Sequence, residues 1–171
     1  MSTLSKDTSQ NKIRFLIDKY TKVAGRDYTE QDTITNFIMP FIEALGWDIF
    51  NVHEVKQQGY PVEFRKALPS ENRPLDHPDC TISVNGNPHI VWEFKRLTSG
   101  GAIDRHERTI TDLLSKGTGL NAKYAVLTSF AEAVVFDVSS QKRLFRIDSP
   151  VEYFLKFEDI WNHLSKEAAL R

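Results

Sequence analysis

Apolar residues in the first quarter of the chain recur at intervals of three and four, which is the spacing of one helix face. This spacing predicts a helix over residues 9–23. A second stripe predicts a helix that begins near Thr29, a good N-cap with Asp32 three residues later, and ends before Gly46. Pro40 lies inside that helix and lacks a backbone N–H, so we expect a kink or a break there.

Farther along the chain the pattern changes to short apolar or alternating runs, which are typical of strands. We expect strands over residues 49–57, 79–84, 89–96 and 123–128, and a hairpin of residues 132–138 and 142–147. We expect helices over residues 102–117 and 157–169, and a long loop over residues 58–77. Loops of this length are often functional.

The order of these elements predicts the topology of the sheet. The helix between strands 89–96 and 123–128 is long enough for a right-handed crossover, so these two strands should be parallel. The strands before them are joined by a hairpin and should be antiparallel. We therefore expect one α/β domain, with a mixed central sheet flanked by helices.

Composition narrows the class of protein. The chain has 171 residues, of which 40% are hydrophobic and 26% charged, as expected of a soluble globular domain. The formal net charge of −1 neither demands nor excludes a polyanionic partner. Cys80 is the single cysteine, which excludes a disulfide framework and a CxxC zinc site. The polar N-terminal stretch does not resemble a signal peptide, so we expect a cytoplasmic protein.

The hairpin of residues 79–96 has one strictly apolar face. Its members all carry even numbers: Cys80, Ile82, Val84, Ile90, Trp92 and Phe94. Because these side chains must be buried together, the register must pair even-numbered with even-numbered residues. The opposite face then carries Asp79, Glu93 and Lys95 at one end of the hairpin. A simple two-residue turn would pair odd with even, so we expect an odd-length loop or a bulge around Asn85–Pro88.

Two interpretations of these three charges are open. They can be ordinary solvated charges at a strand edge, with Lys95 paired to one carboxylate, because the pattern is short and common. Alternatively, Asp79 and Glu93 repel each other unless a cation lies between them, and oxygen ligands suit Mg²⁺ or Mn²⁺. Ionic groups that alternate with Trp92 and Phe94 in a central strand are costly, which favours a functional role. Lys95 would then contact a bound water or a phosphate in metal-assisted hydrolysis.

The same residues resemble a known family. Pro78-Asp79 followed by Glu93-Phe94-Lys95 resembles the PD-(D/E)xK nuclease motif. Residues 30–33 and the stretch FIMPFIEALGWD (37–48) resemble the N-terminal nuclease domain of type IIG and type I restriction enzymes. Residues 124–138 resemble that family's next strand and hairpin, and residues 157–168 its segment leading to a connector and a methyltransferase. The resemblance covers about residues 30–168 and implies a restriction-endonuclease-like fold.

The resemblance also divides the chain and assigns roles. It implies an N-terminal helical segment (1–28), a nuclease core (29–156) and a connector helix (157–171). Asp79, Glu93 and the carbonyl of Phe94 would hold Mg²⁺, for which Mn²⁺ can substitute, and Lys95 would activate the attacking water. Glu30 matches an upstream acid that binds metal; it is equally well explained as an acid that stabilises a helix N-terminus. Glu54, on the first strand, is a further candidate.

Two departures from the family pattern leave room for altered activity. The helix after Lys95 lacks the family's glutamine, so Glu107 or Thr111 stands in for it, or the role is vacant. The family's T-N-G sequence reads Thr128-Ser129-Phe130 here.

DNA contacts are harder to assign. Arg96, Arg105 and Arg108 follow the motif, and Lys116 and Lys123 lie beyond them; all could contact phosphates. Acidic residues alternate with these cations, so for most of them a solvated helix face is the simpler interpretation. The implied partner is DNA. The methyltransferase and target-recognition modules would lie outside this chain, and a second copy could be needed to cut both strands.

The expectation from the sequence is therefore a Mg²⁺-dependent endodeoxyribonuclease domain of a restriction-modification enzyme. Water would attack phosphorus in line and leave a 5′-phosphate and a 3′-hydroxyl. Two alternatives stay open: a non-catalytic DNA-binding or assembly module of the same fold, and a nuclease acting on RNA or structured DNA.

Overall fold

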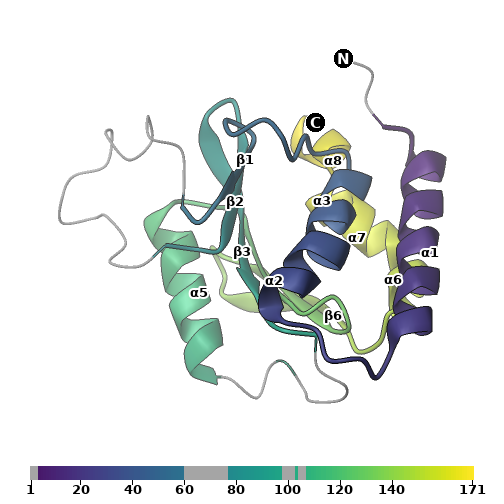
Figure 1. Ribbon diagram of the computed structural model, residues 1–171. Helices are drawn as coiled ribbons and strands as arrows, with labels where there is room; N and C mark the ends of the chain where they lie inside the picture. The colour runs from purple at the N-terminus through teal and green to yellow at the C-terminus, as the bar shows by residue number, and fades with distance from the viewer. Residues whose placement is uncertain (1–3, 60–76, 98–102, 104–106) are drawn as a thin grey trace.

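A six-stranded mixed sheet forms the centre of the molecule (Figure 1). The computed structural model describes residues 4–59, 77–97, 103 and 107–171. The strands are neighbours in chain order. As expected, β3 and β4 are parallel, and the pairs β1–β2, β2–β3 and β5–β6 are antiparallel; β4 and β5 are antiparallel as well. Their bounds are β1 Val55–Gln57, β2 Cys80–Val84, β3 Asn87–Phe94, β4 Tyr124–Thr128, β5 Ala133–Asp137 and β6 Lys142–Ile147. The chain is thus an α/β protein with helices on both faces of the sheet.

The N-terminal part of the chain forms two helical segments. The first is α1 (Lys6–Val23), close to the predicted bounds. The predicted second helix is divided into α2 (Glu30–Thr33), the π-helical η1 (Ile34–Ile38) and α3 (Met39–Ala44). The irregular turn lies immediately before Pro40, where a break was expected. Pro40 cannot donate to the Asn36 carbonyl, and Lys19 Nζ of α1 donates to that oxygen at 3.0 Å instead.

The β2–β3 hairpin has the predicted register. Cys80 pairs with Trp92 and Ile82 with Ile90, even with even, and the register then shifts because His89 is an extra residue. The turn itself has two residues, Asn85 and Gly86, both with positive φ. The predicted bulge is therefore present, one residue beyond the range in which we expected it.

Two predicted elements have different bounds. The strand predicted over residues 49–57 is wrong for residues 49–54, and only Val55–Gln57 is a strand. The side chains of Asp48 and Asn51 accept hydrogen bonds from the backbone N–H groups two residues later, at 3.0 and 3.1 Å, and so form turns there. The predicted helix 102–117 is α5 (Glu107–Gly119), and most of the residues before it lie outside the described part.

The C-terminal part contains three short helices. The helix predicted over residues 157–169 is divided into α7 (Phe157–Leu164) and α8 (Lys166–Ala169), and α6 (Glu152–Leu155) was not predicted. Ser165 causes the division, because its backbone is extended and its hydroxyl caps α8. The predicted loop 58–77 lies almost entirely outside the described residues.

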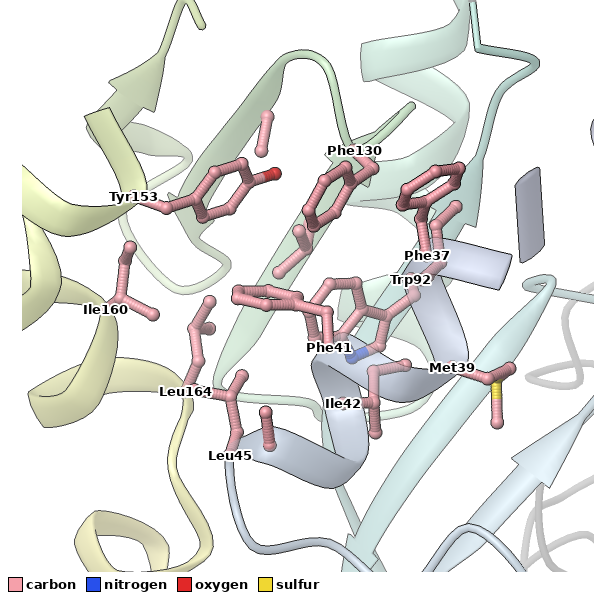
Figure 2. Close-up of a cluster of buried hydrophobic side chains, with 14 of the residues drawn as sticks. Phe37, Met39, Phe41, Ile42, Leu45, Trp92, Phe130, Tyr153, Ile160 and Leu164 are labelled. Atoms are coloured by element: carbon pink, nitrogen blue, oxygen red, sulfur yellow. The ribbon is translucent and has the colours of Figure 1, made fainter. Parts of the chain in front are cut away.

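The two faces of the sheet bury different cores. Helices α1, α3 and α7 pack on one face, together with the even-numbered side chains of β2 and β3, and α5 packs on the other. Figure 2 shows the first core, in which Phe130 lies between Phe37 and Tyr153, with ring centroids 5.1 and 5.2 Å away. The core includes residues of α1 and α7, so both end segments pack onto the sheet domain.

The first described residue, Leu4, and the start of α8 both lie beside Gly46. A Cβ atom placed on Gly46 would lie 3.5 Å from the Cβ of Lys166 and 3.8 Å from that of Leu4. Trp47, the next residue, donates from its indole N–H to the Leu164 carbonyl at 2.8 Å. Among the described residues, no helix has both the length and the apolar character needed to cross a membrane.

Candidate functional site

Asp79, Glu93 and Lys95 meet at one end of the β2–β3 hairpin. The pairing of Cys80 with Trp92 places Asp79, one residue before β2, opposite Glu93, the penultimate residue of β3. Lys95 follows two residues later, and its side chain therefore projects from the same face as Glu93. The structure thus brings together the three residues that define the predicted site.

The Asp79 carboxylate is fixed by the neighbouring strand and partly withdrawn from solvent. Its Oδ2 accepts a hydrogen bond from the Phe94 backbone N–H at 2.6 Å. Burial raises the pKa of Asp79, and the bond from Phe94 partly offsets this rise. The negative charges of Glu93 and Glu30 raise the pKa further, and the charge of Lys95 lowers it. A carboxyl group with these neighbours would be stabilised in its charged form by an added cation.

Glu93 lies between two lysines. Lys95 Nζ contacts Oε1 and Lys116 Nζ contacts Oε2, each at 3.1 Å. The side chains differ in exposure: 14% for Glu93, 10% for Lys116 and 32% for Lys95. The Glu93 carboxylate is therefore fully engaged by positive charge, with a buried partner on one side and a more accessible one on the other.

Lys116 is the site residue that sequence reasoning missed. We considered it only as a phosphate contact on a solvated helix face, but it is one of the buried residues of α5. A signal was present, because Lys116 lies three residues after Leu113 and four before Leu120, within the apolar stripe of the helix. A charged residue at such a position needs a buried partner of opposite charge.

Gly117 explains how α5 reaches the sheet at this point. A Cβ atom there would lie 2.9 Å from one Val138 methyl group and 3.3 Å from a Val91 methyl group. Val91 has the same parity in β3 as Glu93, so it projects from the same face of the sheet. The absence of a side chain at Gly117 thus lets the helix approach closely enough to deliver Lys116 to Glu93.

Glu30 lies within electrostatic range of this cluster, as its effect on the pKa of Asp79 shows. It is the first residue of α2, whose N-terminus is held by a capping box between Thr29 and Asp32. The Thr33 hydroxyl of the same helix accepts a hydrogen bond from the Leu97 N–H at 2.9 Å. This bond fastens the segment after Lys95 to the helix that carries Glu30.

Arg96, a predicted DNA contact, also holds this junction. Its Nε donates to the Tyr28 carbonyl at 2.7 Å, and its guanidinium forms an ion pair with Asp27. Half of the side chain remains exposed. Arg108 is exposed near the start of α5, and Arg105 lies outside the described residues.

Glu54 does not join the site, contrary to expectation. Its Oε1 accepts from the Asp48 N–H at 2.7 Å, and its Oε2 pairs with Lys166 Nζ at 2.6 Å. The Glu54 carbonyl accepts from the Ser83 N–H, at the far end of β2 from Asp79. The residue therefore stabilises the opposite end of the sheet, and the neighbouring His53 is exposed.

The two predicted substitutes for the family's glutamine are exposed on α5. The Thr111 hydroxyl donates to the Glu107 carbonyl at 3.0 Å, within the helix itself. The α5 side chain that contacts Glu93 is Lys116, not either of these two.

The donor set suits a hard cation bound by few protein ligands. Within the described residues, no group of three or more His, Cys, Asp and Glu side chains is arranged to hold a metal ion. Mg²⁺ commonly uses only one or two carboxylates and completes its shell with water and substrate phosphate. Asp79 and Glu93 meet that requirement with oxygen donors. A bound cation would stabilise the charged form of Asp79, which burial and the neighbouring carboxylates disfavour.

The chain is thus an α/β protein with a mixed sheet. Two carboxylates and a lysine lie together at one end of its neighbouring strands β2 and β3. Comparisons with protein-family models, with curated proteins and with solved structures find no match to this chain. Its function must therefore be argued from the site itself.

Proposed function

We propose that the chain is a Mg²⁺-dependent endodeoxyribonuclease domain of the restriction type, with a restriction-endonuclease-like fold. The observation that carries the proposal is the juxtaposition of Asp79 and Glu93 across the hairpin, with Lys95 on the same face. A helix-borne acid, Glu30, lies close enough to raise the pKa of Asp79. This combination agrees with the sequence resemblance to PD-(D/E)xK nucleases.

Asp79, Glu93 and the Phe94 carbonyl would hold the metal. Bound there, Mg²⁺ would polarise the phosphate and lower the pKa of a coordinated water. In the hydrolysis, water attacks phosphorus as the 3′-oxygen departs and takes up a proton. The products are a 5′-phosphate and a 3′-hydroxyl.

The side chains contribute position and charge. The bond from the Phe94 N–H orients the Asp79 carboxylate before any ligand arrives, which avoids part of the cost of ordering it later. Lys95 is the more accessible of the two lysines, so its ammonium can reach an attacking water or a phosphate oxygen. Positive charge placed there stabilises the negative charge that develops on the phosphate.

The test is nicking of a supercoiled plasmid in Mg²⁺ or Mn²⁺. We expect Asp79→Ala and Lys95→Ala each to lower the nicking rate by at least about 100-fold, the usual scale for losing a transition-state group. Asp112→Ala and Lys142→Ala remove one exposed charge of each sign elsewhere and should leave the rate unchanged. Equal nicking by all five proteins would exclude catalysis at this site.

A second candidate is a non-catalytic DNA-binding or assembly module. It is favoured by one observation: both oxygens of Glu93 already contact lysines, which can satisfy the carboxylate without a metal. An absence of nicking by every protein, together with retained binding to duplex DNA, would support this candidate over the nuclease.

A further inference from the structure

Lys116 carries a charge that α5 places in a nearly dry environment. Only 10% of its side chain is exposed, and its partner Glu93 is almost as enclosed. Burying an ammonium group is costly unless an opposite charge lies close by, and Glu93 Oε2 at 3.1 Å provides that charge. The ion pair therefore offsets part of the cost of burying both groups.

The position of Lys116 is also fixed by packing. Gly117 is pressed against Val138 and Val91, and Leu113, one turn earlier, is fully buried. Helix α5 can therefore not withdraw Lys116 from the sheet without opening this contact. Lys95, by contrast, extends from the end of β3 and is 32% exposed, so it can leave Glu93 by rotating its side chain.

We propose that Lys116 is a positioning residue, a resident counter-charge that holds Glu93 Oε2 and weakens the affinity of the site for a divalent cation. The inference rests on the proposed function and deepens it. Lys116 keeps the carboxylate in place before the cation arrives, and Oε1, now contacted by Lys95, is the oxygen presented to it. The ammonium repels a cation bound to the same carboxylate, and the helix packing keeps the Lys116 backbone next to Glu93.

A purely structural role makes a different prediction. If Lys116 only neutralises Glu93 for the sake of folding, its removal should lower stability without strengthening cation binding. If it is a resident counter-charge, its removal should leave a carboxylate that binds a cation more tightly. Cation affinity, measured apart from catalysis, separates the two roles.

The experiment is a titration of the full chain with Mn²⁺ alone, in which free Mn²⁺ is followed by electron paramagnetic resonance. We expect Lys116→Met to bind Mn²⁺ at least 10-fold more tightly than the wild type, because charge repulsion is removed while the side-chain volume is nearly kept. Lys116→Arg retains the charge and should stay within about threefold of the wild type. Lys142→Met removes an exposed lysine and should change nothing.

The outcomes separate this inference from the proposed function. Unchanged or weaker binding by a folded Lys116→Met protein, beside a wild type that binds Mn²⁺, overturns the role of Lys116 and leaves the metal site standing. Binding of Mn²⁺ by Lys116→Met but not by the wild type supports the proposed role of Lys116. Absence of binding in both overturns the inference and the metal site together. Circular dichroism and thermal unfolding establish folding, and Lys116→Gln is judged by the same criterion if the methionine variant does not fold.

Discussion

At the scale of single residues, Phe130 shows how packing can impose an unusual backbone. Its φ of 66° lies in the left-handed region, where the resembled family has glycine. Its ring is stacked with those of Phe37 and Tyr153 and is almost completely buried. The aromatic contacts therefore hold a conformation that would otherwise cost about 1 kcal/mol or more for a residue with a Cβ.

We expect truncation of Phe130 to lower the free energy of unfolding by about 3–5 kcal/mol for Phe130→Ala. Phe130→Gly should lose about 1 kcal/mol less, because glycine adopts positive φ without strain. Urea unfolding of both variants measures the difference. An alanine variant as stable as the glycine variant would show that the backbone at this position is not strained.

Asp79 makes the stability of the protein depend on pH in a defined direction. Its pKa is raised above the ordinary value of 3.8, so across the interval between the two values the folded chain binds more protons than the unfolded chain. The stability that Asp79 contributes is thus present below the ordinary value and is lost as pH rises through the raised one. A charged Asp79 carboxylate at neutral pH therefore lowers the free energy of unfolding.

Asp79→Asn should therefore raise the midpoint of thermal unfolding at pH 7, by about 2 °C for a chain of this size. The gain should shrink to nothing below the ordinary value of 3.8, where the carboxyl group is protonated in both the folded and the unfolded chain. Scanning calorimetry in EDTA measures both conditions, and Asp112→Asn, on the exposed face of α5, is the control. A gain of equal size at both pH values would point to a cause other than ionisation.

At the scale of elements, the contact of α5 with the sheet depends on Gly117. Alanine would be the better helix former by about 1 kcal/mol. Its Cβ would lie only 2.9 Å from a Val138 methyl group, however, and overpacking of this kind costs about 1–3 kcal/mol. We therefore expect Gly117→Ala to lower the free energy of unfolding by about 1 kcal/mol.

Chemical denaturation of a double-mutant cycle tests this contact. Val138→Ala makes room for the new methyl group, so Gly117→Ala should cost about 1 kcal/mol less in that background. Ser115→Ala, on the exposed side of the same helix, should be neutral or slightly stabilising. Additive effects of the two core substitutions would mean that Val138 does not limit the approach of α5.

The elements that could be predicted from the sequence are those in which apolar residues recur at a regular interval and form a single buried face. The β2–β3 hairpin, its register and its bulge followed from the even-numbered apolar residues, because burial of one face leaves only one register. The strand predicted over residues 49–57 is wrong over residues 49–54 because the Asp48 and Asn51 side chains bind local backbone N–H groups. Ser165 divides the last helix for the same physical reason.

At the scale of the whole molecule, the sequence could place the acids and the lysine of the hairpin together but not their partners from distant segments. Lys116 reaches Glu93 through tertiary packing at Gly117, which no local pattern encodes. Glu54 lies beside the hairpin in the sheet, yet its carboxylate pairs with Lys166, 112 residues away. The register of the β2–β3 hairpin could be predicted from the sequence, whereas the ion pairs between distant segments could be identified only in the structure.

The order of the sheet has a consequence for how fast the chain folds. Each strand pairs with its neighbour in sequence, so most of the sheet closes through short loops, and Leu4 and Lys166, near the two ends of the chain, both lie beside Gly46. A circular permutant that joins the ends and opens the exposed turn at Ser139–Ser140–Gln141 would keep every strand pair. It would also turn the β5–β6 hairpin into the pairing with the longest separation in sequence. Folding should become slower because a local contact has become a distant one, while the folded structure stays the same.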